Sequence, residues 1–370
     1  MKILQISSAQ SLGGGERHLI DLANGLAERG HELYLAARPN SPLIDELSVI
    51  RKEHVTTLPL RNSLDAPSAR ELAKLVRQNE IQIVHAHMAR DYPLAAYAAR
   101  RNDRSRLIIT RHVLFPLNRL HRATFSRASR IIAVSEAVAT QLRDDRVAAE
   151  SKITVVLNGI DTARFERTRQ SFDRAQFLKQ WSLPDDSLLV GTVGELTPLK
   201  GQAEFLKAAV QVVQEYPTAY FIVAGTDNSP EQTNGAVLQE LISRLKLTER
   251  VRSVQWLEDI SQLYCALDVF VSASHTESFG LAIAEAMASA TAVVATSTDG
   301  AREIIHSGET GLLVPIGDAD ELADTIIELL ADGDRRARVG AAARQSVSAR
   351  FAMEQMIAAT EKIYMEEIKE

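Results

Sequence analysis

The sequence predicts an α/β protein in which two Rossmann-like domains face each other across a cleft. Its 370 residues exceed the length that one ordinary hydrophobic core serves. In both halves, apolar runs of strand length alternate with helical patterns, which is the order of a doubly wound, mainly parallel sheet. A turn signal, Asn158-Gly159-Ile160-Asp161, and a polar stretch after it separate the two series. We therefore expect one domain at residues 1–160 and a second at 161–354.

Seven strands and four helices are predicted in the first half. Short apolar runs predict the strands at 2–7, 31–37, 55–60, 81–87, 106–112, 130–135 and 153–157. Apolar spacing of helical period predicts the helices at 16–29, 65–79, 91–101 and 136–143. Because ligands of such sheets bind at the carboxyl ends of the strands, functional groups are expected in the loops that follow them.

The second half repeats this alternation. Strands are predicted near 188–194, 219–225, 251–256, 268–274, 292–296 and 311–315. Helices are predicted near 201–215, 233–246, 260–267, 280–290 and 318–331. A last amphipathic helix is predicted at 351–369.

Composition and charge limit the class of protein. The chain is 45% hydrophobic and 24% charged, as in soluble globular proteins, and its 42 basic and 48 acidic residues give a net charge of -6. This balance argues against a general nucleic-acid-binding protein. The single cysteine, Cys265, excludes an internal disulfide framework and fits a reducing cytoplasm. The first residues turn polar too soon for a signal peptide, and no apolar run reaches about 18 residues, so we expect at most peripheral membrane contact.

One stretch between a predicted strand and a predicted helix, residues 275–285, combines two acidic side chains with a helix start. Ser278 is a candidate N-cap, and Gly280 lets a ligand approach the first turn, where free N–H groups and the helix dipole favour an anion such as a diphosphate. A ribose diol could satisfy the buried carboxylate of Glu285, and Glu277 could receive the hydroxyls of a sugar. The alternative is that Glu277 solvates a loop and Glu285 pairs with a core arginine.

The two glutamates have E-x7-E spacing within the block H-T-E-S-F-G-L-A-I-A-E-A-M-A. This block resembles the donor-binding motif of family 4, a large family of retaining glycosyltransferases with the GT-B fold. The resemblance implies that Glu277 contacts the donor sugar and that Glu285 holds the ribose of a UDP- or GDP-sugar. The backbone that would bind its phosphates is that of Ser278, Phe279, Gly280 and Leu281. The GT-B resemblance also implies that a C-terminal helix at 355–370 crosses back onto the first domain.

A glycine-rich loop opens the first predicted helix. Gly13-Gly14-Gly15-Glu16 follows a strand, so its backbone can come close to a phosphate or a sugar. It is not the dinucleotide fingerprint, because G-x-G-x-x-G is absent, and an ordinary glycine-rich turn is the alternative. The surrounding S-L-G-G-G-E-R-H-L-I-D-L-A resembles the family's N-terminal loop, which closes over the donor diphosphate. The resemblance therefore implies donor contacts for Gly14 and Gly15.

Three histidines lie at predicted strand ends in the first half. His112 closes the strand at 106–112, and the resemblance implies a histidine near the reacting sugar there. Without the resemblance, a lone histidine is more often a core or surface group. His85 and His87 form an i, i+2 pair on one strand face, and His87 can border the acceptor. Because no cysteine or acidic residue accompanies this pair at metal-ligand spacing, we expect no zinc site.

Lys200 lies in the turn Gly194-Glu195-Leu196-Thr197-Pro198-Leu199-Lys200-Gly201, after a predicted strand. There it can neutralise a leaving diphosphate, although a solvated lysine is the alternative. The family's usual pattern is G-R-L-x-x-x-K-G, so the lysine is present but Glu195 stands where arginine is commonest. Either Glu195 points away from the donor, or another arginine compensates, or the donor is handled differently.

Further strand ends and two Asp-x-Asp pairs complete the candidates in the second half. Trp256 and Leu257 can border the nucleobase, with a core role for Trp256 as the alternative. The Asp-x-Asp pairs at 318–320 and 332–334 are better explained as helix caps and turns. We therefore expect no required metal and no other cofactor.

A basic segment at residues 100–130 contrasts with the negative net charge. Its arginines are Arg100, Arg101, Arg104, Arg106, Arg111, Arg119, Arg122, Arg127 and Arg130. Its interleaved apolar residues are Phe115, Leu117, Leu120 and Phe125. The pattern favours contact with anionic lipid head groups or a phosphorylated acceptor, with Arg111, Arg119 and Arg122 as candidates, and a solvated helix face is the alternative.

The resemblance implies a metal-independent, retaining hexosyltransferase that moves a sugar from a nucleotide diphosphate sugar to a hydroxyl acceptor. Lipopolysaccharide, polysaccharide or glycolipid assembly, in the cytoplasm or at the inner face of the cytoplasmic membrane, is the expected setting. Two alternatives share the architecture. One is a nucleotide-sugar 2-epimerase, which needs no acceptor, and the other is a catalytically impaired sugar-nucleotide-binding protein, which Glu195 motivates.

Overall fold

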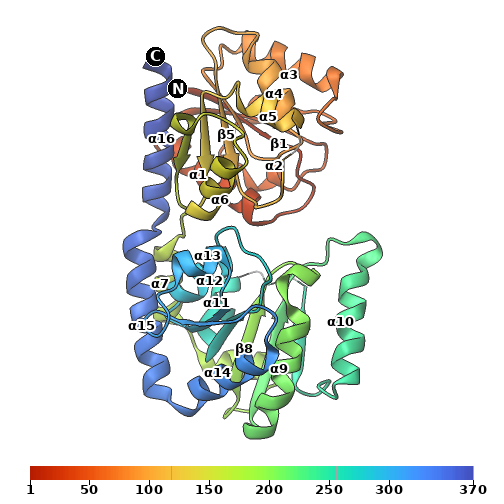
Figure 1. Cartoon of the computed structure of the whole chain (residues 1–370), viewed down its shortest axis with the longest axis vertical. Helices are drawn as coiled ribbons and strands as arrows, with labels where there is room; N and C mark the ends of the chain where they lie inside the picture. Colours follow the sequence, from red (N-terminus) through yellow and green to blue (C-terminus); the bar gives the residue numbers. More distant parts are fainter. Residues whose placement is uncertain (118, 256, 258, 370) are drawn as a thin grey trace. The chain divides into compact units, whose positions relative to one another are not determined.

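The computed structural model of the chain divides into two compact units (Figure 1). The first unit comprises Met1–Gly159 and Met353–Glu370, and the second comprises Ile160–Ala352. The structure describes all residues except 118, 256, 258 and 370, and it describes only the backbone of 119, 120 and 230. Each unit contains one parallel sheet covered by helices, which confirms the predicted pair of α/β folds.

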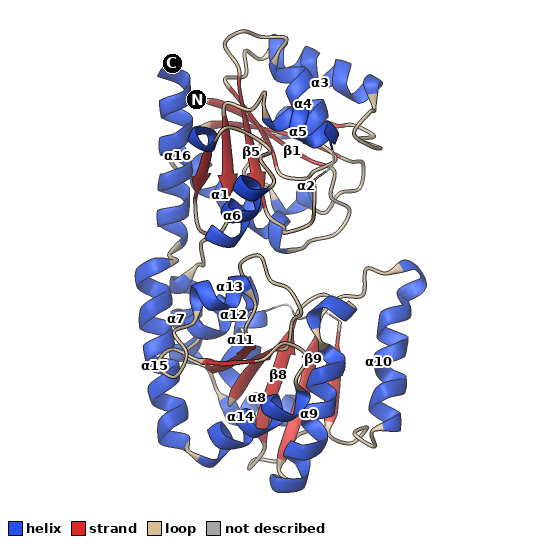
Figure 2. Cartoon of the chain, viewed as in Figure 1, coloured by secondary structure: helices blue, strands red, loops and turns tan. Residues whose placement is uncertain are grey.

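A seven-stranded parallel sheet in the order β3-β2-β1-β4-β5-β6-β7 forms the centre of the first unit. Its strands are β1 (Lys2–Ser7), β2 (Glu32–Ala37), β3 (Val55–Thr57), β4 (Ile83–Ala86), β5 (Arg106–Arg111), β6 (Arg130–Ala133) and β7 (Ile153–Val155). Its helices include α1 (Gly14–Glu28), α2 (Leu43–Glu46), α3 (Ala66–Gln78), α4 (Tyr92–Ala99), α5 (Arg119–Phe125) and α6 (Glu136–Asp144), with 3-10 turns η1 (Lys52–His54) and η2 (Glu150–Lys152) (Figure 2). Side chains alternate between two cores along β1, where Leu4 and Ile6 join one cluster and Ile3 joins the other.

The register of this sheet brings three chain segments to one edge. In the pairing of β1 with β4, Ile6 lies opposite Ala86, and in the pairing of β4 with β5, Ala86 lies opposite Ile109. The segments that follow Ser7, Ala86 and Arg111 therefore leave the sheet at the same carboxyl edge.

The last helix, α16 (Met353–Lys369), belongs to the first unit. Its buried apolar side chains join the core cluster of α1 and the central strands. Arg29 donates to the carboxylates of both Glu354 and Glu361. A Cβ at Gly25 would lie 2.2 Å from the Cδ1 of Ile357, so any larger residue there would force the Ile357 side chain of α16 to move.

A six-stranded parallel sheet in the order β10-β9-β8-β11-β12-β13 forms the centre of the second unit. Its strands are β8 (Leu188–Val193), β9 (Ala219–Ala224), β10 (Val251–Val254), β11 (Val269–Ser272), β12 (Ala292–Thr296) and β13 (Leu312–Val314). Its helices are α7 (Thr162–Ser171), α8 (Arg174–Gln180), α9 (Gln202–Glu215), α10 (Thr233–Arg244), α11 (Ile260–Ala266), α12 (Leu281–Ala288), α13 (Asp299–Ile304), α14 (Ala319–Ala331) and α15 (Gly333–Arg350), with 3-10 turns η3 (Pro198–Lys200) and η4 (Pro230–Gln232). Because β8 and β11 are neighbours, the loops after Val193 and Ser272 leave this sheet side by side.

Several helices lie in segments for which the sequence does not predict a helix. The structure contains α2, α5, α7, α8, α13 and α15 in segments for which no helix is predicted. Most are short or carry few apolar residues, and α7 buries only Phe165, so their apolar periodicity is weak. In the described part of the chain, no helix combines the length and the apolar character that crossing a membrane requires.

Candidate functional site

Two loops at the carboxyl edge of the second sheet are in direct contact. The N–H of His275 donates to the carbonyl of Leu199 at 2.8 Å, which joins the loop after β11 to the loop after β8. Gly201 closes η3 with φ at +64°, and a Cβ there would lie 1.9 Å from the carbonyl oxygen of Ala273. Only glycine fits this turn, because both the positive φ and the contact exclude a side chain. The turn thereby fixes the position of Lys200.

The contact places a cation on a carboxylate. The ammonium Nζ of Lys200 lies 2.6 Å from Oε1 of Glu277, and the hydroxyl of Ser274 donates to the same oxygen at 2.8 Å. The Glu277 side chain is 13% exposed and that of Lys200 is 32% exposed. The two residues that the sequence proposes for sugar and diphosphate are therefore neighbours, and the expectation of a loop glutamate in free solvent does not apply. Sequence reasoning did not single out Ser274.

The helix after Glu277 begins differently from the prediction. The N-cap of α12 is Gly280, with φ at +106° and ψ at 59°, so the prediction of Ser278 as N-cap is wrong. Glycine adopts this left-handed conformation without strain, which explains why the cap lies two residues later than Ser278. Phe279 is buried, with its ring centroid 5.4 Å from that of Phe351, whereas Ser278 and Leu281 are half-buried. The first-turn amides of α12 thus start at Gly280 and Leu281, beside Glu277.

A neighbouring helix, α13, fixes the backbone at Glu277. The N–H of Gly300 donates to the Glu277 carbonyl at 3.1 Å. A Cβ at Gly300 would lie 2.8 Å from that oxygen and 2.5 Å from the carbonyl oxygen of Phe279. Glycine is therefore required for this approach. The pair Asp299-Gly300 is the only signal in the sequence, and sequence reasoning missed it.

Glu285 lies one turn into α12 and is half-buried. Its Oε2 accepts a hydrogen bond of 2.9 Å from the hydroxyl of Tyr264, a fully buried residue of α11. Burial, with the carboxylate beside it, raises the pKa of Tyr264 well above its usual range, so the phenol remains a donor. A tyrosine is therefore one partner of this carboxylate.

The remaining candidates of the second unit have separate surroundings. The Glu195 side chain is exposed, and its backbone carbonyl accepts from Nε2 of Gln202 at 2.9 Å. Leu257 is half-buried, whereas Trp256 lies outside the described residues. The first aspartates of both Asp-x-Asp pairs are N-caps, as predicted, since Asp318 accepts from the N–H of Glu321 and Asp332 from that of Arg335.

In the first unit, the glycine-rich loop opens α1. Gly13 is the N-cap, and its N–H donates to Oε2 of Glu16 at 3.0 Å. Gly14 is exposed, and a Cβ at Gly15 would lie 3.4 Å from Cγ of His112. The structure thus brings the loop against the histidine at the end of β5, two features that the sequence analysis proposes separately.

Histidines from α1, from β4 and from the segments after β4 and β5 meet beside this loop, and all are buried except His112, which is half-buried. Nδ1 of His87 lies 3.3 Å from Nε2 of His112, and the His18 and His112 ring centroids are 4.8 Å apart. The two nitrogens of His85 contact the hydroxyls of Tyr364 (2.6 Å) and Thr110 (2.7 Å). His18 was not a sequence-based candidate, because its only signal is a buried position on α1.

Burial keeps these histidines neutral. It lowers the pKa of His18 to about 4, against a smaller opposing effect of the hydrogen bond to Asn158. It also lowers the pKa values of His85, His87 and His112 well below the usual range, and the neighbouring imidazoles add to the effect. The cluster can therefore offer nitrogen lone pairs at neutral pH.

The basic segment divides between the interior and the surface. Arg111 is buried and donates to the carbonyl of Phe115, and Arg130 contacts Glu367 of α16 at 2.7 Å. These guanidinium groups stabilise the fold. Arg122 is exposed, as is Phe115, whereas the side chain of Arg119 lies outside the described part of the structure.

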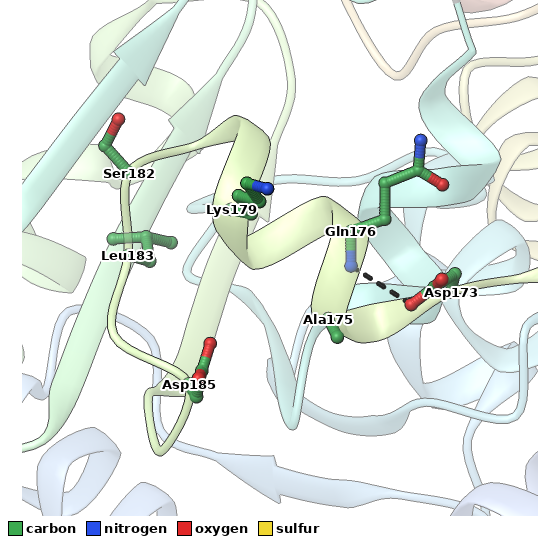
Figure 3. A pocket seen from close by; sticks show the side chains of 7 residues that line it. All are labelled: Asp173, Ala175, Gln176, Lys179, Ser182, Leu183 and Asp185. Atoms are coloured by element: carbon green, nitrogen blue, oxygen red, sulfur yellow. Dashed lines mark hydrogen bonds between the residues drawn. The ribbon is translucent and has the colours of Figure 1, made fainter.

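A surface hollow lies along α8, apart from all predicted site residues (Figure 3). Its lining comprises Asp173, Ala175, Gln176, Lys179, Ser182, Leu183 and Asp185. Asp173 accepts from the N–H of Gln176 at 3.0 Å and caps the helix. The lining joins one helix turn to the following loop.

Comparison with known proteins extends these observations. Residues 173–346 match the family model described as Glycosyl transferases group 1, and residues 12–164 match the model described as Glycosyltransferase Family 4. The first match spans Lys200, Glu277 and Glu285, and the second spans the glycine-rich loop and the histidines.

Similar proteins cover nearly the whole chain. N-acetyl-alpha-D-glucosaminyl L-malate synthase of Bacillus anthracis is 25% identical over 99% of this chain and 97% of its own. The lipopolysaccharide core biosynthesis glycosyltransferase LpsE of Rhizobium meliloti is 28% identical over 92% of this chain and 93% of its own. The crystal structure of Anabaena Alr3699/HepE in complex with UDP-glucose has a TM-score of 0.85 and 26% identity, and the match covers 98% of this chain and 99% of that one.

Proposed function

Because this chain belongs to the group 1, family 4 glycosyltransferases, we propose that it transfers a hexose from a nucleotide diphosphate sugar to a hydroxyl acceptor with retention of anomeric configuration. The observation that carries the proposal is the contact of Lys200 with Glu277 beside the first turn of α12. One cation, one carboxylate and free helix amides are the groups that a sugar diphosphate requires.

We assign the diphosphate to Lys200 and to the backbone of Ser278, Phe279, Gly280 and Leu281. In the unliganded chain the Lys200 ammonium is neutralised by Glu277 at 2.6 Å. A diphosphate shares that ammonium when it binds, and the sugar hydroxyls then donate to the Glu277 carboxylate. As the glycosidic bond breaks, negative charge grows on the leaving phosphate, so Lys200 stabilises the transition state more than the ground state.

We assign the ribose to Glu285 and the base to the loop that contains Leu257. Tyr264 donates to one carboxylate oxygen of Glu285 at 2.9 Å and holds the side chain in place. A carboxylate can accept several hydrogen bonds, so a ribose diol can bind in addition to the tyrosine. A UDP-sugar is the first choice of donor, because the similar Anabaena protein has a structure in complex with UDP-glucose, and a GDP-sugar is the second.

In the first unit we assign Gly14 and Gly15 to the donor diphosphate, His112 to the reacting sugar and His87 to the acceptor side. The glycine backbone lies against His112, and burial keeps that imidazole neutral, so it can form a hydrogen bond to a sugar hydroxyl. The transfer itself uses no metal in this scheme, because Lys200 and the α12 amides supply the positive charge that a bound cation supplies elsewhere.

The name of one similar protein supports a proposal for the acceptor class. We propose a cell-envelope saccharide or glycolipid, since the Rhizobium relative acts in lipopolysaccharide core biosynthesis. We also propose that exposed Arg122 and Phe115 bring the chain to an anionic membrane surface from the cytoplasm. Cosedimentation with anionic and with neutral vesicles tests this membrane contact separately from the transfer.

A panel of nucleotide sugars in a thermal-shift assay tests the donor assignment. Binding to the folded chain raises the melting temperature, and the compound with the largest shift names the base and the sugar. Glu277→Gln, Glu285→Gln and Lys200→Met should each reduce the shift, while Glu309→Gln, at an exposed glutamate of the same unit, should not. No shift with any nucleotide sugar, or unchanged binding in Glu285→Gln, contradicts the proposal.

Sugar transfer is measured with the nucleotide sugar that gives the largest thermal shift as donor and with a fraction of a cell extract as the source of acceptor. Lys200→Met should lower kcat about 100-fold, in the range seen when one transition-state hydrogen-bond donor is removed. Donor consumption that needs no acceptor would indicate a nucleotide-sugar 2-epimerase, and tight binding without transfer would indicate a binding protein. Product NMR reports the anomeric configuration, and activity retained in EDTA supports metal-independent transfer.

A further inference from the structure

The His18 ring has a nitrogen that no described group uses. His18 is 3% exposed, and its Nδ1 lies 2.9 Å from Oδ1 of Asn158. Because an amide oxygen only accepts hydrogen bonds, Nδ1 carries the proton and Nε2 holds a lone pair. That Nε2 is buried without a hydrogen-bond partner among the described residues. A buried acceptor of this kind costs free energy unless something binds it.

His87 offers a second lone pair for the same reason. Its Nε2 lies 2.8 Å from Oε1 of Gln5 and therefore carries the proton, which leaves Nδ1 as an acceptor. Nε2 of His112 lies 3.3 Å from this Nδ1. Two imidazole lone pairs, on His18 and His87, thus lie beside a third imidazole that can release its Nε2 by moving its own proton to Nδ1.

The spacing of the three rings suits one small cation. His18, His87 and His112 each offer a nitrogen, and these three nitrogens all lie within 4.8 Å of one another. A tetrahedral Zn²⁺ with bonds of about 2.0 Å to imidazole nitrogens holds them about 3.3 Å apart. The His87 to His112 distance already has this value, and the His18 contacts must shorten by at most about 1.5 Å, a movement that side-chain rotation can supply.

We propose that His18, His87 and His112 form a binding site for a divalent transition metal, with Zn²⁺ as the preferred ion. Three neutral imidazoles favour zinc, cobalt or copper over magnesium and calcium, which prefer oxygen ligands. Three protein ligands leave the fourth tetrahedral position open to water or to an oxygen of a small molecule. The site lies wholly within the first unit. It shares His112 and His87 with the proposed sugar and acceptor positions, and metal binding is measured separately from transfer.

The groups behind two of the three rings, His18 and His87, support ligation. Asn158 and Gln5 are both buried, and each accepts from the ring nitrogen that faces away from the metal position. Such outer partners fix the tautomer and orientation of metal-bound histidines, and their loss typically weakens metal binding by about 10- to 100-fold.

Metal titration of the full chain, stripped of metal and free of any histidine tag, tests the site. Co²⁺ should bind one equivalent and give the visible absorption of tetrahedral cobalt, Zn²⁺ should displace it in calorimetry, and Mg²⁺ should not compete. His18→Gln, His87→Gln and His112→Gln should each weaken Zn²⁺ binding at least about 100-fold, and Asn158→Ala about tenfold. His306→Gln, at an exposed histidine of the second unit, is the matched control and should bind as the wild-type chain does.

X-ray absorption spectroscopy of the zinc-loaded wild-type chain needs no variant and therefore does not depend on whether the buried histidine variants fold. Three imidazole nitrogens at about 2.0 Å support the site. Fewer than three imidazoles in that spectrum, absence of saturable 1:1 binding, or equal affinity in the three histidine variants and the wild-type chain would each overturn the proposal.

Discussion

The pairing of Lys200 with Glu277 predicts a measurable coupling free energy in a double-mutant cycle. The Nζ to Oε1 distance is 2.6 Å, and the side chains are 32% and 13% exposed. Exposed ion pairs contribute about 0.2–1 kcal/mol, whereas hydrogen bonds to charged groups contribute about 1.5–3 kcal/mol. Since this pair is partly sheltered and directly bonded, we expect Lys200→Met and Glu277→Gln to be coupled by about 1–2 kcal/mol in the free energy of unfolding.

The assay is urea unfolding of the wild-type chain, both single variants and the double variant. The exposed pair Lys74 and Glu71, 3.9 Å apart, is the control and should be coupled by no more than about 0.5 kcal/mol. Saturating UDP should lower the Lys200–Glu277 coupling, because the diphosphate competes for the ammonium. A coupling below about 0.3 kcal/mol in the free chain would refute the reasoning, since unrelated sites add within that range.

Three further predictions concern single substitutions, each followed by urea unfolding. Gly201→Ala should destabilise the chain by about 2–4 kcal/mol, because a Cβ would lie 1.9 Å from the Ala273 carbonyl at a positive φ, and a loss below about 0.5 kcal/mol would contradict this. Tyr264→Phe should lower the free energy of unfolding by about 1–3 kcal/mol, because it removes the 2.9 Å hydrogen bond to Glu285, and it should also weaken donor binding. Unchanged stability would argue against a contribution of this hydrogen bond. Burial raises the pKa of Asp91 from 3.8 to about 6. The folded chain therefore binds a proton at the Asp91 carboxyl more tightly than the unfolded chain does, and the wild-type chain loses stability as the pH rises from about 4 to about 6. The free energy of unfolding of Asp91→Asn should therefore exceed that of the wild-type chain by up to about 3 kcal/mol at pH 7, and this difference should disappear near pH 3. An equal gain in stability at both pH values would contradict the shifted pKa of Asp91.

The sequence predicts the sheets well because their strands are nearly continuous apolar runs. β11 and β12 are wholly buried, and such strands are recognised by their apolar character alone. The start of α12 was harder to predict. Ser278 is a favourable cap by residue type, but the left-handed conformation at Gly280 decides where the helix begins. Residue preferences predict the N-cap at Ser278, whereas the conformation of the loop in the folded chain places it two residues later, at Gly280.

The helix α15 shows why some elements escape prediction. It buries only Val339, Gly340, Ala343 and Val347, so no broad apolar stripe marks it. A Cβ at Gly340 would lie 2.0 Å from the carbonyl oxygen of Ala290, which means that the helix packs through small residues at very short range. Close packing of this kind depends on shape, and hydrophobic periodicity does not report it.

The histidine cluster illustrates the same limit for the site. The sequence shows His85 and His87 on one strand and gives no reason to connect them with His18, which lies far away along the chain. Only the parallel register of β1, β4 and β5 brings α1 and the ends of two strands to one edge. The expectation that no zinc site exists considered only ligand spacing within one segment, and it stays a prediction until metal binding is measured.

Glu195 stands where the resembling family usually has arginine, which changes the charge near the proposed donor position and leaves the turn intact. The Glu195 side chain points into solvent, and the turn is held by its backbone carbonyl, which accepts from Gln202 at 2.9 Å. A Cβ at Gly194 would lie 3.6 Å from Cδ of Lys200, so the lysine stem runs along this glycine toward Glu277. Because these contacts position Lys200 without any arginine, the exchange should alter the strength of diphosphate binding more than its geometry.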